Sequence, residues 1–198
     1  FSQLTSDKRV EHILERAEYY GYSGDRVKGL IFCSTKKEAS ELSKKFNETG
    51  RYSTIMLCGE NSQEERESAV ERLVTTNHPH KLDYIFTVDI FNEGVDIPEI
   101  NQVIMLRPTE SPIIFVQQLG RGLRKADGKE FVIVIDFIGN YQNNYMIPIA
   151  LSGDRTGNKD NIRRSLMEGN NLIQGASTIY FDEVSRKRIY ESIDKAKT

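Results

Sequence analysis

The sequence predicts an α/β fold in which a parallel β-sheet carries helices on both faces. Short runs rich in Val, Ile, Leu and Phe recur along the chain, which is typical of strands buried on both sides. Longer segments with helical spacing of apolar residues lie between these runs. Strands that alternate with such helices form right-handed crossovers in a parallel sheet. The 198 residues suffice for one full hydrophobic core and little more.

The expected elements follow one another in regular order. An amphipathic helix is predicted over 7–20, because Ser6 precedes apolar residues at helical spacing and Gly21 follows them. Strands are predicted at 30–33, 53–57, 83–88, 101–106 and 131–135. Helices are predicted at 36–48, 63–75 and 111–123. Each has a hydroxyl cap, with capping boxes at Thr35 and Glu38 and at Ser62 and Glu65, and with Ser111 before Pro112.

The character of the sequence changes after Asp136, where Asn and Tyr replace the apolar runs. We therefore expect an N-terminal helix and linker at 1–28, the main domain at 29–150, and an appendage or the start of a further domain at 151–198. The opening Phe1-Ser2-Gln3 has no signal-peptide pattern and looks cut from a longer protein.

Composition narrows the classes of function. The net charge of −2 excludes strong general affinity for a polyanion, so any nucleic acid must bind in a local groove. Basic candidates for such a groove are Lys36, Lys37, Arg107, Lys125 and Lys129. No apolar run is long enough to span a membrane. The cysteines and histidines lack metal-ligand spacing, so we expect no metal site. The chain has only two cysteines, and we expect Cys33 and Cys58 to be buried, reduced thiols in a cytoplasmic protein.

The segment Gln117-Gln118-Leu119-Gly120-Arg121-Gly122-Leu123-Arg124 carries the strongest chemical signal. Arg121 and Arg124 lie three residues apart, so they share one helix face. Two guanidinium groups on one face can clamp a polyphosphate bidentately. A solvated basic turn is the simpler interpretation of an isolated Arg-x-x-Arg, so the neighbouring segments decide between the two.

Two upstream segments place polar groups at the carboxyl ends of strands. The run 83–88 ends at Thr87 and leads into a loop with Gly94, Asp96 and Pro98. The run from Gly29 to Cys33 leads into the hydroxyls of Ser34 and Thr35 at a helix start, which is a natural phosphate contact. Ligands bind at this edge of open α/β sheets.

These segments together resemble motifs IV, V and VI of superfamily 2 helicases, the DEAD/DEAH-like nucleic-acid motors, in the family's order and spacing. Motif VI is met by Gln117, Gly120, Arg121 and Arg124, and motif V by Gly94, Asp96 and Pro98. The resemblance covers about residues 29–140. The motif V sequence Phe-Asn-Glu-Gly-Val-Asp-Ile-Pro is more similar to that of restriction-enzyme-like DNA helicases than to that of the DEAD-box RNA helicases, so we expect DNA to be the nucleic acid that is bound.

The resemblance implies a RecA-like helicase C-terminal domain that shares ATP and Mg²⁺ with an N-terminal RecA-like domain. Arg121 and Arg124 are then arginine fingers toward the γ-phosphate, an interaction that contributes about 10³–10⁵ in rate. The same likeness assigns Gln117, Gly120, Gly94 and Asp96 to the nucleotide. It assigns Ser34, Thr35 and Thr87 to the binding of nucleic-acid phosphates. Arg107 is added to this group of contacts because of its positive charge.

The chain lacks the phosphate loop Gly-x-x-x-x-Gly-Lys-Ser/Thr, so we expect it to be inactive as an ATPase by itself. Asp182 and Glu183 imitate the acidic pair of a Mg²⁺ site, but they also make an ordinary acidic helix start. A non-catalytic nucleic-acid clamp or a protein-docking scaffold of helicase ancestry is the alternative function, and the intact Gln117, Arg121 and Arg124 argue against it. A free-standing nucleotide-binding domain is disfavoured by the missing glycine loop.

Overall fold

The computed structural model describes residues 5–88, 90, 97–107, 126–137, 160, 161, 164, 187 and 191. The chain divides into two compact units, one of residues 1–107 and 118–137 and the other of residues 108–117 and 138–198. Nearly all described residues belong to the first unit, and the fold reported below is that of this unit.

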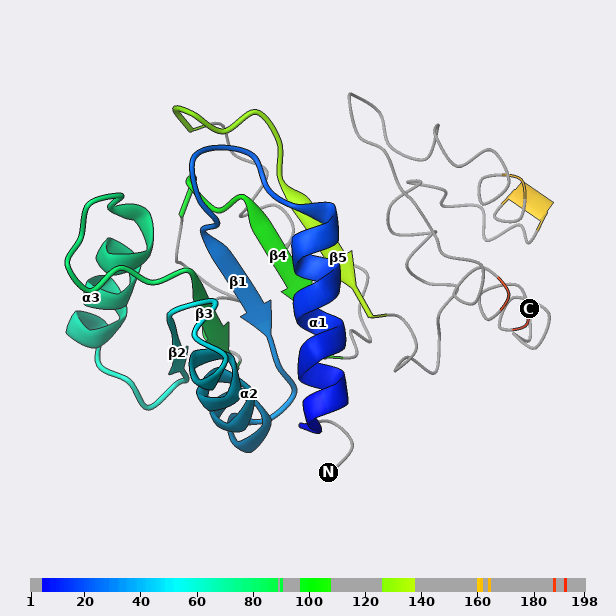
Figure 1. Ribbon diagram of the computed structural model, residues 1–198, viewed down its shortest axis with the longest axis horizontal. Helices are drawn as coiled ribbons and strands as arrows, with labels where there is room; N and C mark the ends of the chain where they lie inside the picture. Colours follow the sequence, from blue (N-terminus) through cyan, green and yellow to red (C-terminus); the bar gives the residue numbers. More distant parts are fainter. Residues whose placement is uncertain are drawn as a thin grey trace. The chain divides into compact units, whose positions relative to one another are not determined.

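A parallel sheet forms the centre of the first unit (Figure 1). Its strands are β1 (Gly29–Phe32), β2 (Thr54–Leu57), β3 (Tyr84–Thr87), β4 (Gln102–Met105) and β5 (Ile133–Asp136). They lie in the order β2-β3-β1-β4-β5, and each neighbouring pair is parallel. The helices are α1 (Asp7–Tyr20), α2 (Lys36–Glu48) and α3 (Gln63–Val74). The predicted parallel α/β fold is therefore confirmed, with strand ends shifted by one or two residues.

The helices begin where their hydroxyl caps predict. Ser6 accepts a hydrogen bond from the Arg9 amide, and Ser62 and Glu65 form the complete reciprocal capping box. The box expected at α2 forms only in part. Thr35 accepts from the Glu38 amide at 3.1 Å, and the Glu38 carboxylate accepts mainly from the amide of Ser34, at 3.0 Å, with a weaker interaction from the amide of Thr35. The helix predicted at 111–123 lies outside the described residues.

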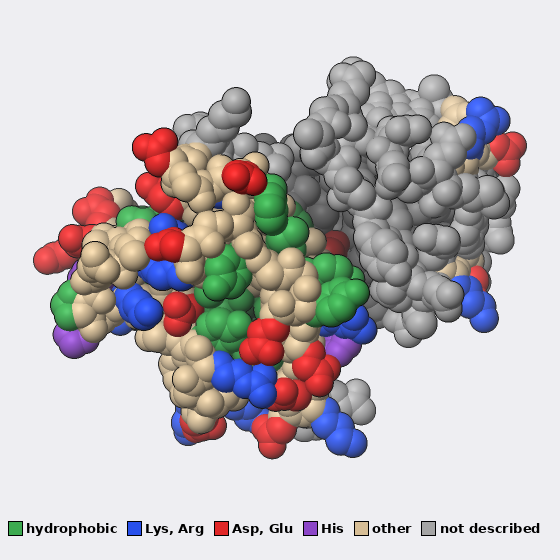
Figure 2. Space-filling model, turned by 45° about the horizontal axis from the view of Figure 1, so that its top comes forward, with side chains coloured by type: hydrophobic (Ala, Val, Ile, Leu, Met, Phe, Trp, Pro, Cys, Tyr) green, Lys and Arg blue, Asp and Glu red, His purple; other side chains and the backbone are tan. Residues whose placement is uncertain are grey.

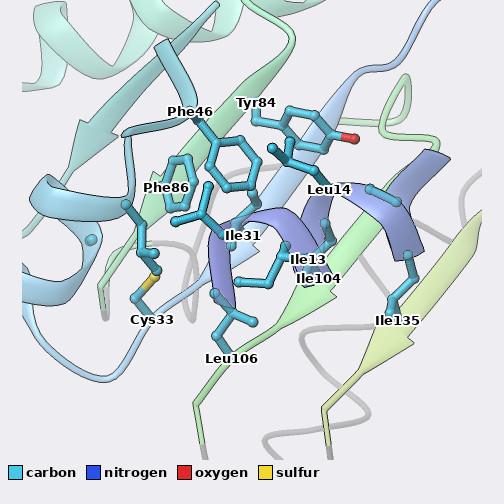
Figure 3. Packing of buried hydrophobic residues seen from close by; sticks show 14 of the residues in the cluster. Ile13, Leu14, Ile31, Cys33, Phe46, Tyr84, Phe86, Ile104, Leu106 and Ile135 are labelled. Atoms are coloured by element: carbon cyan, nitrogen blue, oxygen red, sulfur yellow. The ribbon is translucent and has the colours of Figure 1, made fainter. Parts of the chain in front are cut away.

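The main core lies between the sheet and helices α1 and α2 (Figure 3). Side chains alternate along a strand, so Ile31, Phe86 and Ile104 point to this one face. Phe46 of α2 packs edge-on against Phe86, with ring centroids 5.0 Å apart. Cys33 and Cys58 are buried free thiols, as predicted. This packing fixes α1 and α2 over the sheet and so fixes the loops that end on them.

The amino ends of the strands carry an internal polar network that ties α1 to the sheet. The Tyr84 hydroxyl donates to Gln102 at 2.6 Å, and the Gln102 amide donates to the carbonyls of Ala17 and Gly21 at the end of α1. Gly29 is on β1, which lies between β3, the strand of Tyr84, and β4, the strand of Gln102. A Cβ at Gly29 would lie 2.2 Å from a ring carbon of Tyr84, so the ring occupies the space that a side chain would need.

Asn101 and Arg26 close the rest of this amino edge. Asn101 accepts from the Lys28 amide and donates to the carbonyls of Ser23 and Arg26. The guanidinium of Arg26 donates to the carbonyls of Leu73, Thr75, Leu82 and Val27, which fastens the end of α3 to the start of β3. Carbonyls at a helix end need such donors because they have no partner within the helix.

Candidate functional site

Four predicted site residues are described, and they gather at the carboxyl edge of the sheet. Ser34 and Thr35 follow β1, Thr87 ends β3, and Arg107 follows β4. Because β3, β1 and β4 are adjacent and parallel, their carboxyl ends meet at one edge. The other predicted residues, Gly94, Asp96, Gln117, Gly120, Arg121 and Arg124, lie outside the described residues.

Ser34 and Thr35 form an exposed turn between β1 and α2. The Thr35 oxygen accepts from the Glu38 amide, which leaves its hydroxyl proton able to donate to a ligand. The Ser34 amide is already bound to the Glu38 carboxylate. The donors that this turn can offer to a phosphate are therefore its two hydroxyls, together with the dipole at the start of α2.

Thr87 has a different environment. Its side chain is 0% exposed, and its hydroxyl has no hydrogen-bond partner in the described part of the chain. Its carbonyl accepts from the amide of Cys33 at 2.9 Å, so the end of β3 is held beside the end of β1. The Thr87 hydroxyl is therefore buried away from solvent, unlike those of Ser34 and Thr35. Arg107 follows β4, which lies on the other side of β1 from β3, and it is half-buried.

Two of the lysines flanking these motifs, Lys36 and Lys129, are already bound within the protein. Lys36 forms an ion pair with Glu60 at 2.5 Å, and this hydrogen bond raises the pKa of Lys36 and lowers that of Glu60. Lys129 was a candidate for nucleic-acid binding from its charge. The structure instead places it at the amino edge, where its ammonium donates to the carbonyls of Pro98 and Ile100 and burial lowers its pKa. Figure 2 shows acidic and basic side chains interspersed on the visible face.

A buried charged pair adjoins the Ser34–Thr35 turn and was missed as a pair in the sequence. Glu38 is 1% exposed, and its Oε1 lies 3.9 Å from Nη2 of Arg9 in the first turn of α1. Burial raises the pKa of Glu38, while the Ser34 amide and Arg9 oppose that shift. Nothing local signals this contact, because the two residues belong to different helices.

Two features are absent from the described residues. Among them, no cluster of three or more His, Cys, Asp or Glu side chains is placed to hold a metal ion. No helix in the described ranges has the length and apolar character needed to cross a membrane.

The comparison with protein families agrees with the motifs. The profile of the helicase conserved C-terminal domain matches residues 8–126, which is more than half of the chain. The chain belongs to this family. The match includes α1 except its first residue, the strands β1 to β4, and every predicted motif residue. It places the chain with the C-terminal domains of superfamily 2 helicases.

Relatives of this helicase domain include a putative ATP-dependent helicase and a subunit of a type I restriction enzyme. The putative ATP-dependent helicase IRC3 of Saccharomyces cerevisiae is 27% identical over 139 residues, covering 70% of this chain and 19% of the yeast protein. The EcoKI type I restriction endonuclease subunit of Escherichia coli is 29% identical over 119 residues, covering 56% of this chain and 10% of its own length. The chain thus spans a fifth or less of these two relatives.

Solved structures establish the fold. The yeast DEAD-box splicing factor Prp28 aligns over 94% of this chain and 35% of its own, with a TM-score of 0.63 and 18% identity. A fragment of a putative HsdR subunit of a type I restriction enzyme from Vibrio vulnificus aligns over 69% of this chain and 27% of its own, with a TM-score of 0.55 and 20% identity. The sheet is that of a RecA-like helicase C-terminal domain.

Proposed function

We propose that this chain is the second motor domain of an ATP-dependent helicase or translocase that acts on DNA. The observation that carries the proposal is positional. The turn of motif IV and the strand end that leads into motif V lie side by side at the carboxyl edge, in a chain that belongs to the helicase C-terminal family. Ligands of open α/β sheets bind at this edge.

ATP is shared with another domain in this proposal. The 198 residues contain no glycine-rich phosphate loop, so a preceding RecA-like domain holds ATP and Mg²⁺. Arg121 and Arg124 then reach the γ-phosphate and neutralise charge that builds in the transition state. Gln117 and Gly120 line the same cleft, Gly94 lets the loop approach the nucleotide, and Asp96 either reaches the ribose hydroxyl or orients an arginine.

The nucleic-acid strand is held through its phosphates. Ser34 and Thr35 donate their hydroxyl protons, Arg107 adds positive charge, and Thr87, whose hydroxyl is buried without a hydrogen-bond partner in the described part of the chain, is the fourth proposed contact. Such contacts fix position without reading sequence. The preference for DNA rests on the wording of residues 91–98 and on the restriction-enzyme relative. Closure on ATP moves these contacts relative to those of the first domain, and hydrolysis releases them.

The arginine assignment is tested in the intact protein by Arg121→Ala and Arg124→Ala. Because the fingers act on the transition state, we expect each variant to lower kcat for DNA-stimulated hydrolysis at least about 10³-fold with nearly unchanged ATP binding. Steady-state hydrolysis and a fluorescent ATP analogue measure the two quantities. The 198-residue chain alone should show no turnover. Parental rates in both variants would show that the fingers lie elsewhere.

A non-catalytic clamp or docking scaffold is the second candidate function. The net charge of −2 and the paired state of Lys36 favour it, because they reduce general attraction to a polyanion. The same experiment separates the two functions, since a scaffold hydrolyses no ATP in the intact protein.

A further inference from the structure

The helices α2 and α3 both start at the carboxyl edge with a hydroxyl cap and a glutamate three residues later, yet the two glutamates differ. Glu65 of α3 is exposed and binds the amide of Ser62 at 2.7 Å, within its own capping box. Glu38 of α2 is 1% exposed and binds the amide of Ser34, one residue before the cap. The Glu38 carboxylate thus holds the turn itself and not only the helix end.

A carboxylate at this position conflicts with phosphate binding by the same turn. Two like charges at close range repel strongly where water is excluded. Burial of an ionised carboxylate is also unfavourable without a partner of opposite charge. Arg9 supplies that charge at 3.9 Å from Glu38, across the contact between α1 and α2.

Arg9 is itself incompletely satisfied. Its Nε and Nη2 atoms are buried and make no hydrogen bond in the described part of the chain, while 18% of its side chain remains exposed. Arg26 and Arg66 also have a buried Nε without a hydrogen bond in the described part of the chain, so the contact with Glu38 is what distinguishes Arg9. The neighbouring ion pair accounts for the position of Arg9 and leaves it with hydrogen-bonding capacity.

We propose that Arg9 and Glu38 are a positioning pair for nucleic-acid phosphate binding. Glu38 holds the amide of Ser34 and so fixes the Ser34–Thr35 turn, and Arg9 cancels the negative charge that would otherwise repel a phosphate there. The inference rests on the proposed function and deepens it. Neither residue contacts the nucleotide or the reacting atoms in this account.

Removing the charge of Arg9 and removing the charge of Glu38 should have different effects on the affinity for a single strand. Arg9→Gln leaves the Glu38 carboxylate uncompensated, so the affinity for a single strand should fall at least about tenfold, as expected for loss of a charged partner near a phosphate. Glu38→Gln keeps an acceptor for the Ser34 amide and removes the repelling charge, so affinity should be retained. In the double variant the loss caused by Arg9→Gln should be largely restored. Arg9→Lys should retain most of the affinity.

The experiment uses the intact protein and a fluorescein-labelled oligothymidylate, with oligouridylate in parallel. Fluorescence anisotropy at mildly alkaline pH, which favours the ionised form of Glu38, gives the dissociation constants, and thermal unfolding of each variant gives its stability. Glu65→Gln is the matched control, because it changes the corresponding glutamate of α3, which is exposed and accepts hydrogen bonds from Asn61 and Ser62.

Restoration of affinity by Glu38→Gln in the Arg9→Gln background supports the pair, because loss of folding alone would not be repaired by a second charge removal. Unchanged affinity in Arg9→Gln, or a loss that Glu38→Gln does not restore, overturns it. If the parental protein binds neither oligonucleotide, the proposed function fails first, and that result is distinguishable from failure of the pair.

Discussion

The two edges of the sheet differ in how their polar groups are used. At the amino edge, Asn101, Gln102 and Arg26 bind backbone carbonyls and amides of the same domain, and Tyr84 binds Gln102. At the carboxyl edge, the Ser34–Thr35 turn is exposed, and Thr87 and Arg9 keep buried atoms without hydrogen bonds in the described residues. One edge is closed from within, and the other retains groups that a ligand can satisfy.

This difference teaches where stability and function are separated in the fold. Buried polar groups that are fully paired rigidify a structure, whereas those left without partners cost free energy and persist where a ligand supplies the partner. Arg26 shows that the division is not absolute, because its Nε lacks a partner although its other nitrogens are bound. Substitutions at the amino edge should therefore lower stability, and those at the carboxyl edge should lower ligand affinity.

The largest expected effect on stability is at Gly29. In Gly29→Ala the new Cβ would lie 2.2 Å from the ring of Tyr84, which must move and lose its bond to Gln102. Overpacking of this kind costs about 3 kcal/mol of unfolding free energy. Chemical denaturation measures the loss. Gly59→Ala is the control, because nothing lies within 4 Å of its Cβ position. If the two variants were equally stable, the claim that packing at the amino edge contributes specially to stability would be contradicted.

Asn101→Ala should produce the next largest loss. The substitution leaves the Lys28 amide and the carbonyls of Ser23 and Arg26 without their side-chain partner, at a net cost of about 2 kcal/mol. Single-strand affinity should stay at the parental value, since Asn101 lies at the opposite end of the strands from the binding turn. Denaturation and anisotropy on the same samples check both parts. A large loss of affinity in a folded variant would break the comparison between the edges.

Local patterns in the sequence predicted the parallel sheet and the helix starts. Alternating apolar runs and hydroxyl caps act over a few residues, so Ser6, Thr35 and Ser62 could be placed correctly from spacing alone. The same reasoning did not reveal that the Glu38 carboxylate binds mainly the Ser34 amide, because spacing cannot distinguish Ser34 from Thr35 as its donor.

Contacts between distant segments escaped prediction for a physical reason. Arg9 meets Glu38 only when α1 packs beside α2, and Lys129 reaches the carbonyls of Pro98 and Ile100 only in the folded loop. In each contact the two partners are farther apart in the sequence than one helical turn, so charge type and spacing could not predict that they meet. The requirement for glycine at position 29 likewise depends on the ring of Tyr84 from another strand.

The smallest effect on stability, and the most direct test, comes from comparing two helix caps at the carboxyl edge. The double variant Ser34→Ala with Thr35→Ala and the single variant Ser62→Ala each remove a cap hydroxyl, at a cost of about 1 kcal/mol in stability. The measurement is the single-strand affinity of the intact protein with each change. We expect the double variant to bind about tenfold more weakly, as loss of phosphate hydrogen bonds requires, and Ser62→Ala to bind like the parent. Equal affinities in the two variants, with lowered melting temperatures in both, would contradict the account, because the turn would then serve only to cap α2.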